Sequence, residues 1–146
     1  MSREHALGLE ILRVSTLMRR YADNSAELRQ SHNITGSNGW ILAFLYEHEG
    51  EDIYQKDLEE AFSVTRSTVS KVVKLMESKG LIRRESVFHD ARLKKLILTD
   101  KGREVHQLAA QGNEQLEARL EKNFTPEEKK MFLSFLCRVT ENLENI

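Results

Sequence analysis

The sequence predicts a mainly α-helical protein with one small β-hairpin. In the first and last segments of the 146 residues, at residues 7–28 and 131–146, apolar side chains recur at intervals of three and four, which is the spacing of helices with one buried face. A single proline and seven glycines leave few interruptions. Two short segments rich in Ile, Val, Leu and Phe, residues 82–88 and 93–98, flank a polar tip and predict the hairpin.

The first predicted helix covers residues 4–30. Its apolar residues form one seam, in which Ser25 is the only polar member. A seam this long on a terminal helix has to be buried, either against a second chain or against the rest of the same domain. The seam consists of Leu7, Ile11, Val14, Met18, Tyr21, Ser25 and Leu28.

The second predicted helix covers residues 35–48 and is strongly apolar. Thr35 can cap it, because the side-chain oxygen can accept a hydrogen bond from a free N–H group of the first turn. Gly50 stands where glycine commonly ends a helix. We therefore expect a buried helix here.

Two further helices are predicted at residues 54–61 and 66–79, separated by a turn at Ser63-Val64-Thr65. We expect Leu58 and Phe62 to be buried. This layout is that of a helix-turn-helix, in which the second helix enters the major groove of DNA.

The helix at residues 66–79 has two distinct faces. Val69, Val72, Val73 and Met76 fall within about 100° of arc. The opposite face holds only cations and small hydroxyls, which can contact phosphates and base edges. An ordinary amphipathic surface helix is the alternative. The residues predicted to contact DNA from this helix are Arg66, Ser67, Thr68, Ser70, Lys71 and Lys74.

The predicted hairpin is also basic, with its tip at residues 89–92. A basic hairpin beside a recognition helix is a wing, and Arg92 at its tip can reach the minor groove. Asp90 can steer Arg92 through a bidentate ion pair, or it can merely make the turn. The remaining wing cations, predicted to contact phosphates, are Arg83, Arg84, Lys94 and Lys95.

The charge of the chain is concentrated around this region. Residues 65–95 contain nine Lys or Arg and three acids, whereas the remaining residues contain 13 bases and 20 acids. A basic segment of this kind can bind a polyanion such as DNA. A basic surface that is only solvated would have the same composition.

Two long helices are predicted after the hairpin. Thr99 can cap the first, at residues 100–122, and Thr125-Pro126 begins the second, which runs to about residue 144. Apolar helices at both ends of the chain favour a homodimer, and packing within one chain is the alternative. The second seam consists of Met131, Phe135, Val139, Leu143 and Ile146, with Phe132 and Leu136 beside it.

Four sequence motifs, and their order along roughly residues 34–103, resemble those of the MarR family of regulators. They are Ser63-Val64-Thr65-Arg66-Ser67-Thr68-Val69-Ser70, Leu75-Met76-Glu77-Ser78-Lys79-Gly80-Leu81-Ile82-Arg83-Arg84, Asp90-Ala91-Arg92 and Leu96-Ile97-Leu98-Thr99-Asp100-Lys101-Gly102.

The resemblance implies a single domain over residues 1–146. Residues 34–102 would form a winged helix-turn-helix, and residues 1–33 and 103–146 would form dimerisation helices. It also implies a homodimeric transcription regulator that reads a palindromic site in double-stranded DNA, most often as a repressor released by a small ligand or another signal. Gly36 and Gly39 depart from the family pattern and predict a loose helix start.

Other functions find less support. Cys137 lies between apolar residues, so we expect it to serve core packing. No metal-ligand spacing, phosphate loop or nucleophile elbow is present, so we expect no metal, no cofactor and no enzyme. A charged N-terminus and the lack of an apolar run of membrane length predict a cytoplasmic protein without membrane contact. The remaining alternative is a winged protein-interaction module, whose marks would be acids or bulky apolar residues on the outer face of the 66–79 helix.

Overall fold

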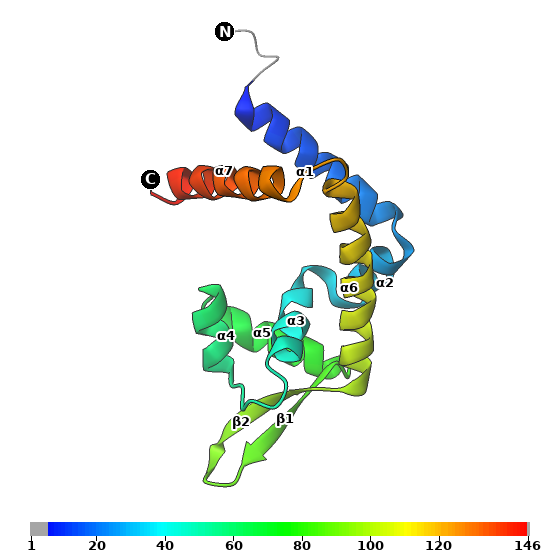
Figure 1. Cartoon of the computed structure of the whole chain (residues 1–146). Helices are drawn as coiled ribbons and strands as arrows, with labels where there is room; N and C mark the ends of the chain where they lie inside the picture. The colour runs from blue at the N-terminus through cyan, green and yellow to red at the C-terminus, as the bar shows by residue number, and fades with distance from the viewer. Residues whose placement is uncertain (1–5, 146) are drawn as a thin grey trace. The chain divides into compact units, whose positions relative to one another are not determined.

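The computed structural model describes residues 6–145, and it is mainly helical with a two-stranded antiparallel hairpin (Figure 1). The predicted fold class is therefore confirmed. The chain divides into two compact units, with the boundary between Asn113 and Glu114 inside helix α6. None of the helices between residues 6 and 145 combines the length and the apolar character needed to cross a membrane.

The predicted first helix is two helices, α1 (Leu7–Asn24) and α2 (Ala26–Thr35). The prediction of one continuous helix was wrong at Ser25, which has an extended backbone and accepts a hydrogen bond from the Leu28 N–H at 3.4 Å. A serine in this position satisfies a free N–H group of the next helix, which favours a break. Residues 4 and 5 of the predicted helix lie outside the described residues.

Thr35 does not cap the following helix, contrary to the prediction. It is the buried last residue of α2, and its hydroxyl donates to the Ser31 carbonyl at 3.0 Å. Gly36 then adopts a positive φ of 59°, which glycine permits, and a short 3-10 helix, η2 (Gly36–Asn38), leads into α3 (Gly39–Glu47).

The predicted helix-turn-helix is confirmed as α4 (Gln55–Phe62) and α5 (Arg66–Ser78). Thr65 caps α5 by accepting from the Thr68 N–H at 3.3 Å. Leu58 is fully buried as predicted, but Phe62 is partly exposed. Its ring packs beside Trp40, with centroids 4.4 Å apart, at the margin of the core.

The hairpin consists of β1 (Ile82–Val87) and β2 (Asp90–Leu98). Pairing is regular from Ile82 opposite Leu98 to Ser86 opposite Lys94, and an irregularity follows, so that Val87 pairs with Asp90. The second strand thus begins at Asp90 rather than at residue 93. At the other end of the hairpin, the Leu96 N–H donates to the Ile53 carbonyl at 2.7 Å and ties the hairpin to the segment before α4.

One hydrophobic core joins α3, α4, α5 and the base of the hairpin. All four residues of the predicted inner face of α5 are buried in it. This core fixes the orientation of α5 and leaves its opposite face to solvent. The largest fully buried side chains are Ile41, Leu42, Leu58, Met76, Leu81, Ile82, Val69 and Val73.

The last two helices are α6 (Asp100–Leu120) and α7 (Pro126–Glu144). The Thr99 hydroxyl accepts from the Gly102 N–H at 3.0 Å, which confirms the predicted cap of α6. Thr125 and Glu128 form a capping box at α7, which confirms the predicted start of the last helix.

Candidate nucleic-acid interface

The outer face of α5 carries the side chains that the sequence assigned to DNA. Arg66, Ser67, Lys71 and Lys74 are exposed, and Ser70 is half-buried. No acidic residue lies on α5 before Glu77, near its C-terminal end. The face therefore offers hydrogen-bond donors and positive charge without a repelling carboxylate.

Hydroxyl groups cluster at the N-terminus of α5. The Thr65 hydroxyl donates to the Thr68 hydroxyl at 2.9 Å and lies 3.2 Å from that of Ser67. Thr68 accepts in this pair, so its own hydrogen remains available as a donor. The positive end of the helix dipole lies here as well, which favours an anion such as a phosphate.

Three of the predicted phosphate contacts already hold carboxylates of the same chain. Arg83 pairs with Glu85 at 2.8 Å, Arg84 pairs with Glu77 at 2.7 Å, and Lys95 lies 3.4 Å from Asp52. The side chain of Lys94 donates to the Ser86 hydroxyl instead of to an acid. Hydrophobic periodicity predicts neither the pairs between separate elements, Arg84–Glu77 and Lys95–Asp52, nor the pair within one strand, Arg83–Glu85.

The remaining cations have no such partners. Within residues 6–145, no ion pair or side-chain hydrogen bond involves Arg66, Lys71, Lys74 or Arg92. Three of these lie on α5 and one lies at the tip of the hairpin. The predicted DNA-contacting cations that lack a carboxylate partner thus lie on the two elements that a winged helix-turn-helix presents to DNA.

Asp90 shapes the tip of the hairpin through the backbone. Its carboxylate accepts from the Arg92 N–H at 2.8 Å, and no ion pair joins it to the Arg92 guanidinium in the described residues. The predicted bidentate pair is therefore absent, because the carboxylate is used in a local turn between residues i and i+2. The guanidinium of Arg92 is therefore free of an ion pair at the tip of the hairpin within the described residues.

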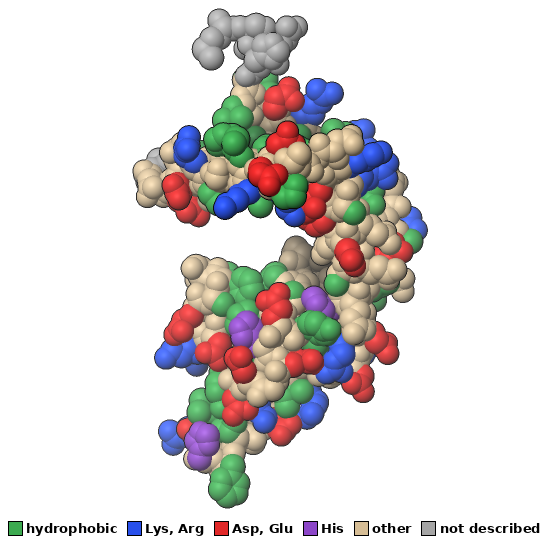
Figure 2. All heavy atoms as spheres, in the orientation of Figure 1, with side chains coloured by type: hydrophobic (Ala, Val, Ile, Leu, Met, Phe, Trp, Pro, Cys, Tyr) green, Lys and Arg blue, Asp and Glu red, His purple; other side chains and the backbone are tan. Residues whose placement is uncertain are grey.

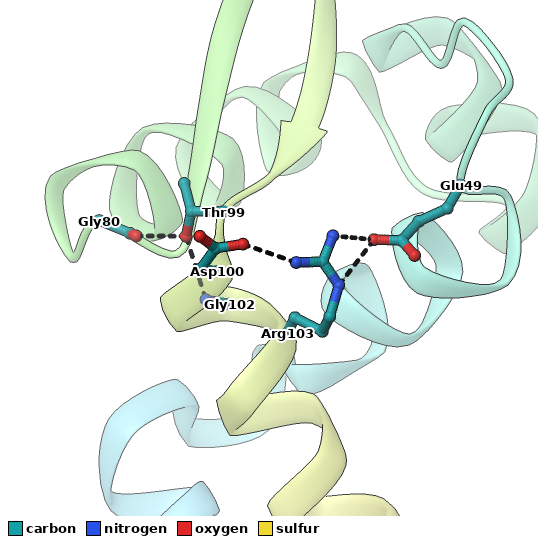
Figure 3. Close-up of polar contacts among 6 residues, drawn as sticks. All are labelled: Glu49, Gly80, Thr99, Asp100, Gly102 and Arg103. Carbon is teal, nitrogen blue, oxygen red and sulfur yellow. Dashed lines mark hydrogen bonds and ion pairs between the residues drawn. The ribbon is translucent and has the colours of Figure 1, made fainter.

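A polar network joins the segment after α3, the residues that flank the hairpin and the first turn of α6 (Figure 3). Arg103 on α6 contacts Glu49, with the Nε atom 3.1 Å from the carboxylate, and Asp100 at 2.8 Å. These contacts raise the pKa of Arg103, chiefly through the hydrogen bond to Glu49. The Thr99 hydroxyl donates to the Gly80 carbonyl at 2.6 Å, at the end of α5. The network links the recognition helix, the wing and α6.

Gly102 is part of the same joint. A Cβ atom at this position would lie 2.0 Å from the Leu81 carbonyl oxygen, so only glycine lets the first turn of α6 approach the start of the hairpin. Nearby, the Lys101 side chain donates to the Lys79 carbonyl at 2.9 Å. The sequence signal for this joint is the Thr-x-x-Gly spacing, which the resemblance supplied without a structural reason.

The predicted dimerisation seams are not covered within the unit to which each belongs. No described residue of α1 or α7 is buried. Leu7, Ile11, Val14, Met131, Phe135 and Leu143 are exposed, while Met18, Tyr21 and Val139 are half-buried. Apolar side chains are visible on α1 and α7 in Figure 2. Ile146 lies outside the described residues.

Cys137 is exposed on α7, so the expectation that it serves core packing was wrong for the single chain. The apolar face of α7 around it has no cover within its own unit. Among residues 6–145, no group of three or more His, Cys, Asp or Glu side chains lies close enough together to hold a metal ion.

Comparisons with known proteins agree with this architecture. A family model described as the MarR family matches residues 32–93. An uncharacterized HTH-type transcriptional regulator of Bacillus subtilis, YybA, is 29% identical over 92% of this chain and 89% of its own length.

Two solved structures are similar over nearly the whole chain. The Staphylococcus aureus MepR–DNA complex has a TM-score of 0.76 at 27% identity, covering 95% of this chain and 99% of that chain. The heme sensor protein PefR of Streptococcus agalactiae, in complex with heme, has a TM-score of 0.73 at 27% identity, covering 95% and 94%. The chain is therefore a winged-helix transcriptional regulator that is similar to the MarR family, and the relatives and structures it matches are regulators, not enzymes.

Proposed function

We propose that the protein is a sequence-specific regulator that binds a palindromic site in double-stranded DNA as a homodimer. The observation that carries this proposal is the outer face of α5, where free cations and hydroxyls are exposed without an acid among them. An ordinary exposed helix mixes both signs of charge, whereas a major-groove helix gains from excluding carboxylates. The similar MepR structure was solved with DNA, which supports the same use of this surface.

We assign different roles to the residues of this surface. Arg66, Ser67, Thr68, Ser70, Lys71 and Lys74 would lie in the major groove, and Arg92 would enter the minor groove from a tip that Asp90 holds in its turn. Lys94 would contact a phosphate directly. Arg83, Arg84 and Lys95 would contact phosphates only if their ion pairs with carboxylates are shared or broken. We therefore expect these three residues to contribute less to DNA affinity.

The homodimer follows from the exposed seams of α1 and α7. Large apolar side chains of both helices are exposed on their own units, and a second copy would bury the same surfaces on each subunit. Replacing both Ile11 and Met18 by glutamate should give monomers or unfolded chains, whereas the wild-type protein should be a dimer by light scattering at micromolar concentration. A monomeric wild-type protein would refute the homodimer.

We further propose that DNA binding responds to a small ligand or another signal, and that the protein acts as a repressor in the cytoplasm, where a bacterial chromosome lies. The likeness to a protein named as a heme sensor supports a ligand-responsive regulator of this architecture. This likeness assigns no particular ligand to the present chain.

The experiment that tests DNA recognition is selection from a random pool of duplexes by the full-length protein, followed by sequencing. We expect enrichment of an inverted repeat whose half-sites lie about one helical turn apart, because a two-fold dimer presents two recognition helices. Lys71→Ala should relax the selected sequence at particular base pairs. If the wild-type protein enriches no sequence, even at low salt, the proposed function is wrong.

A further inference from the structure

Phe88 stands at the tip of the wing and is fully exposed, with a relative exposure of 108%. Hydrophobic side chains are visible at the far end of the hairpin in Figure 2. No aromatic or cation–π contact among the described residues involves this ring. A large apolar side chain that is fully exposed at a protruding tip gains free energy when a partner covers it.

Phe88 follows directly on the last residue of β1. Val87 is buried, whereas Phe88 begins the turn and its side chain is exposed. The link between the strands consists of Phe88 and His89 alone, and the Asp90 carboxylate fixes the chain that follows by accepting from the Arg92 N–H. The ring is therefore presented outward on a structured turn.

The charges beside Phe88 favour a polyanionic partner. Arg92, four residues away, has no ion-pair partner within residues 6–145, and the side chain of Lys94 is bound only to the neutral Ser86 hydroxyl. Asp90 is the acid of the tip, and one of its carboxylate oxygens accepts from the Arg92 N–H of the turn. An apolar wedge flanked by free cations matches the chemistry of side chains that enter the minor groove and separate adjacent base pairs.

We propose that Phe88 is a wedge that inserts between two base pairs at the minor groove, beside Arg92, and kinks the duplex there. This inference rests on the proposed function, and the partner is double-stranded DNA. A wedge costs unstacking energy, which is smallest at flexible pyrimidine–purine steps. Phe88 thereby adds a preference for such a step at a position that α5 does not contact.

The test uses the full-length protein and a duplex recovered by the random-pool selection. The fluorescent base 2-aminopurine replaces adenine, one position at a time, across the minor-groove segment under the wing, where a rise in fluorescence reports unstacking. The variants are Phe88→Ala, which removes the wedge, and Phe88→Trp, which keeps an aromatic ring. Leu93→Ala is the matched control, because it removes another exposed apolar side chain from the same hairpin.

We expect the wild-type protein, Phe88→Trp and Leu93→Ala to raise the fluorescence at one step, and Phe88→Ala to abolish the rise. Phe88→Ala should weaken binding to the selected duplex on the order of 10-fold, as loss of an aromatic–base stack does. Its thermal midpoint should stay unchanged, because the ring contributes no packing in the free protein.

Three results would overturn the wedge while leaving the proposed function intact. The first is no rise in fluorescence with the wild-type protein, and the second is a rise that persists with Phe88→Ala. The third is wild-type affinity of Phe88→Ala for the duplex, which would assign the exposed ring to a protein or lipid partner instead. Failure of the wild-type protein to select any duplex would instead refute the proposed function.

Discussion

At the scale of single residues, Asp90 and Arg92 have different roles at the wing tip. The carboxylate of Asp90 holds the turn by accepting from a backbone N–H, which leaves the guanidinium of Arg92 without an ion-pair partner in the described chain. An exposed ion pair at this place would contribute little to stability and would reduce the charge available to DNA. The turn thus presents the arginine without neutralising it.

The first prediction separates these two roles. Arg92→Ala should leave the thermal midpoint unchanged and weaken binding to the selected duplex by about 1–3 kcal/mol, the usual cost of a good groove contact. Asp90→Ala should weaken binding less, and Asp90→Asn should bind nearly as wild type, since an asparagine side chain can accept the same hydrogen bond. Wild-type affinity of Arg92→Ala at fixed salt would exclude the minor-groove role of this residue.

A second prediction compares a free cation with a paired one. Lys71→Ala should lower DNA affinity without changing the free energy of unfolding, because Lys71 is exposed and has no partner in the described residues. Arg84→Ala should cost up to about 1 kcal/mol of stability through the lost pair with Glu77, and it should lower DNA affinity less than Lys71→Ala. Urea denaturation and binding titrations at one salt concentration give both quantities. A larger affinity loss in Arg84→Ala would contradict the division into free and paired cations.

At the scale of helices and strands, the joint between α5, the hairpin and α6 sets the geometry of the DNA surface. Thr99 and Lys101 donate to the carbonyls that follow the last turn of α5, and Arg103 ties α6 to Glu49 after α3. These contacts satisfy groups that would otherwise be unpaired at a helix end. The recognition helix and the wing are therefore held to one another by α6.

The third prediction concerns the glycine of that joint. In a helix, Gly→Ala normally stabilises by about 0.5–1 kcal/mol, and Gly8→Ala on the open surface of α1 should do so. Gly102→Ala should instead destabilise by about 1–3 kcal/mol, because the added Cβ atom overlaps the Leu81 carbonyl oxygen. Thermal midpoints of both variants test this contrast. A Gly102→Ala protein as stable as Gly8→Ala would show that the close approach does not exist in solution.

The fourth prediction concerns His106, whose ring on α6 packs against Tyr46 of α3 with centroids 4.4 Å apart. Partial burial lowers the pKa of His106, although Glu47 and Glu49 oppose the shift. Protonation then favours the unfolded chain, in which histidine has a pKa of about 6.5. The contribution of His106 to stability is thus complete above that pH and declines as the pH falls through the lowered pKa.

His106→Asn should remove this source of pH dependence. Between about pH 7 and pH 5, the wild-type protein should lose more free energy of unfolding than the variant, while the other titrating groups act alike in both. Urea denaturation at several pH values measures the difference. Parallel curves for the two proteins would contradict the burial of a neutral ring.

The helix and strand types could be predicted from the sequence, because period and capping signals such as Thr99 and Thr125-Pro126 are local. The errors fell on residues whose role depends on context. The sequence predicts Ser25 inside a helix, but it caps α2. It predicts Thr35 as a cap, but Thr35 ends α2 and donates to the Ser31 carbonyl, since short hydroxyl side chains suit several positions at a helix end. The pair between Lys95 and Asp52 joins residues 43 positions apart, which no local pattern reveals.

At the scale of the whole molecule, the exposed seams and the free cations support a single functional unit of two chains. The exposed seams require a partner with a matching apolar surface, and the free cations require a polyanion. Two copies would double the number of free cations offered to one duplex. Affinity for DNA should therefore depend steeply on salt, and specificity should depend on the contacts that α5 and the wing make with base edges.

The measurement that tests this account most directly is the affinity of the full-length protein for the selected duplex and for a scrambled duplex, over a series of salt concentrations. We predict linear plots of log K against log salt, with a slope of about −0.9 for each phosphate neutralised. The selected duplex should bind at least about 10³-fold more tightly than the scrambled one near physiological salt. Affinities that are equal for both duplexes, or independent of salt, would contradict the account.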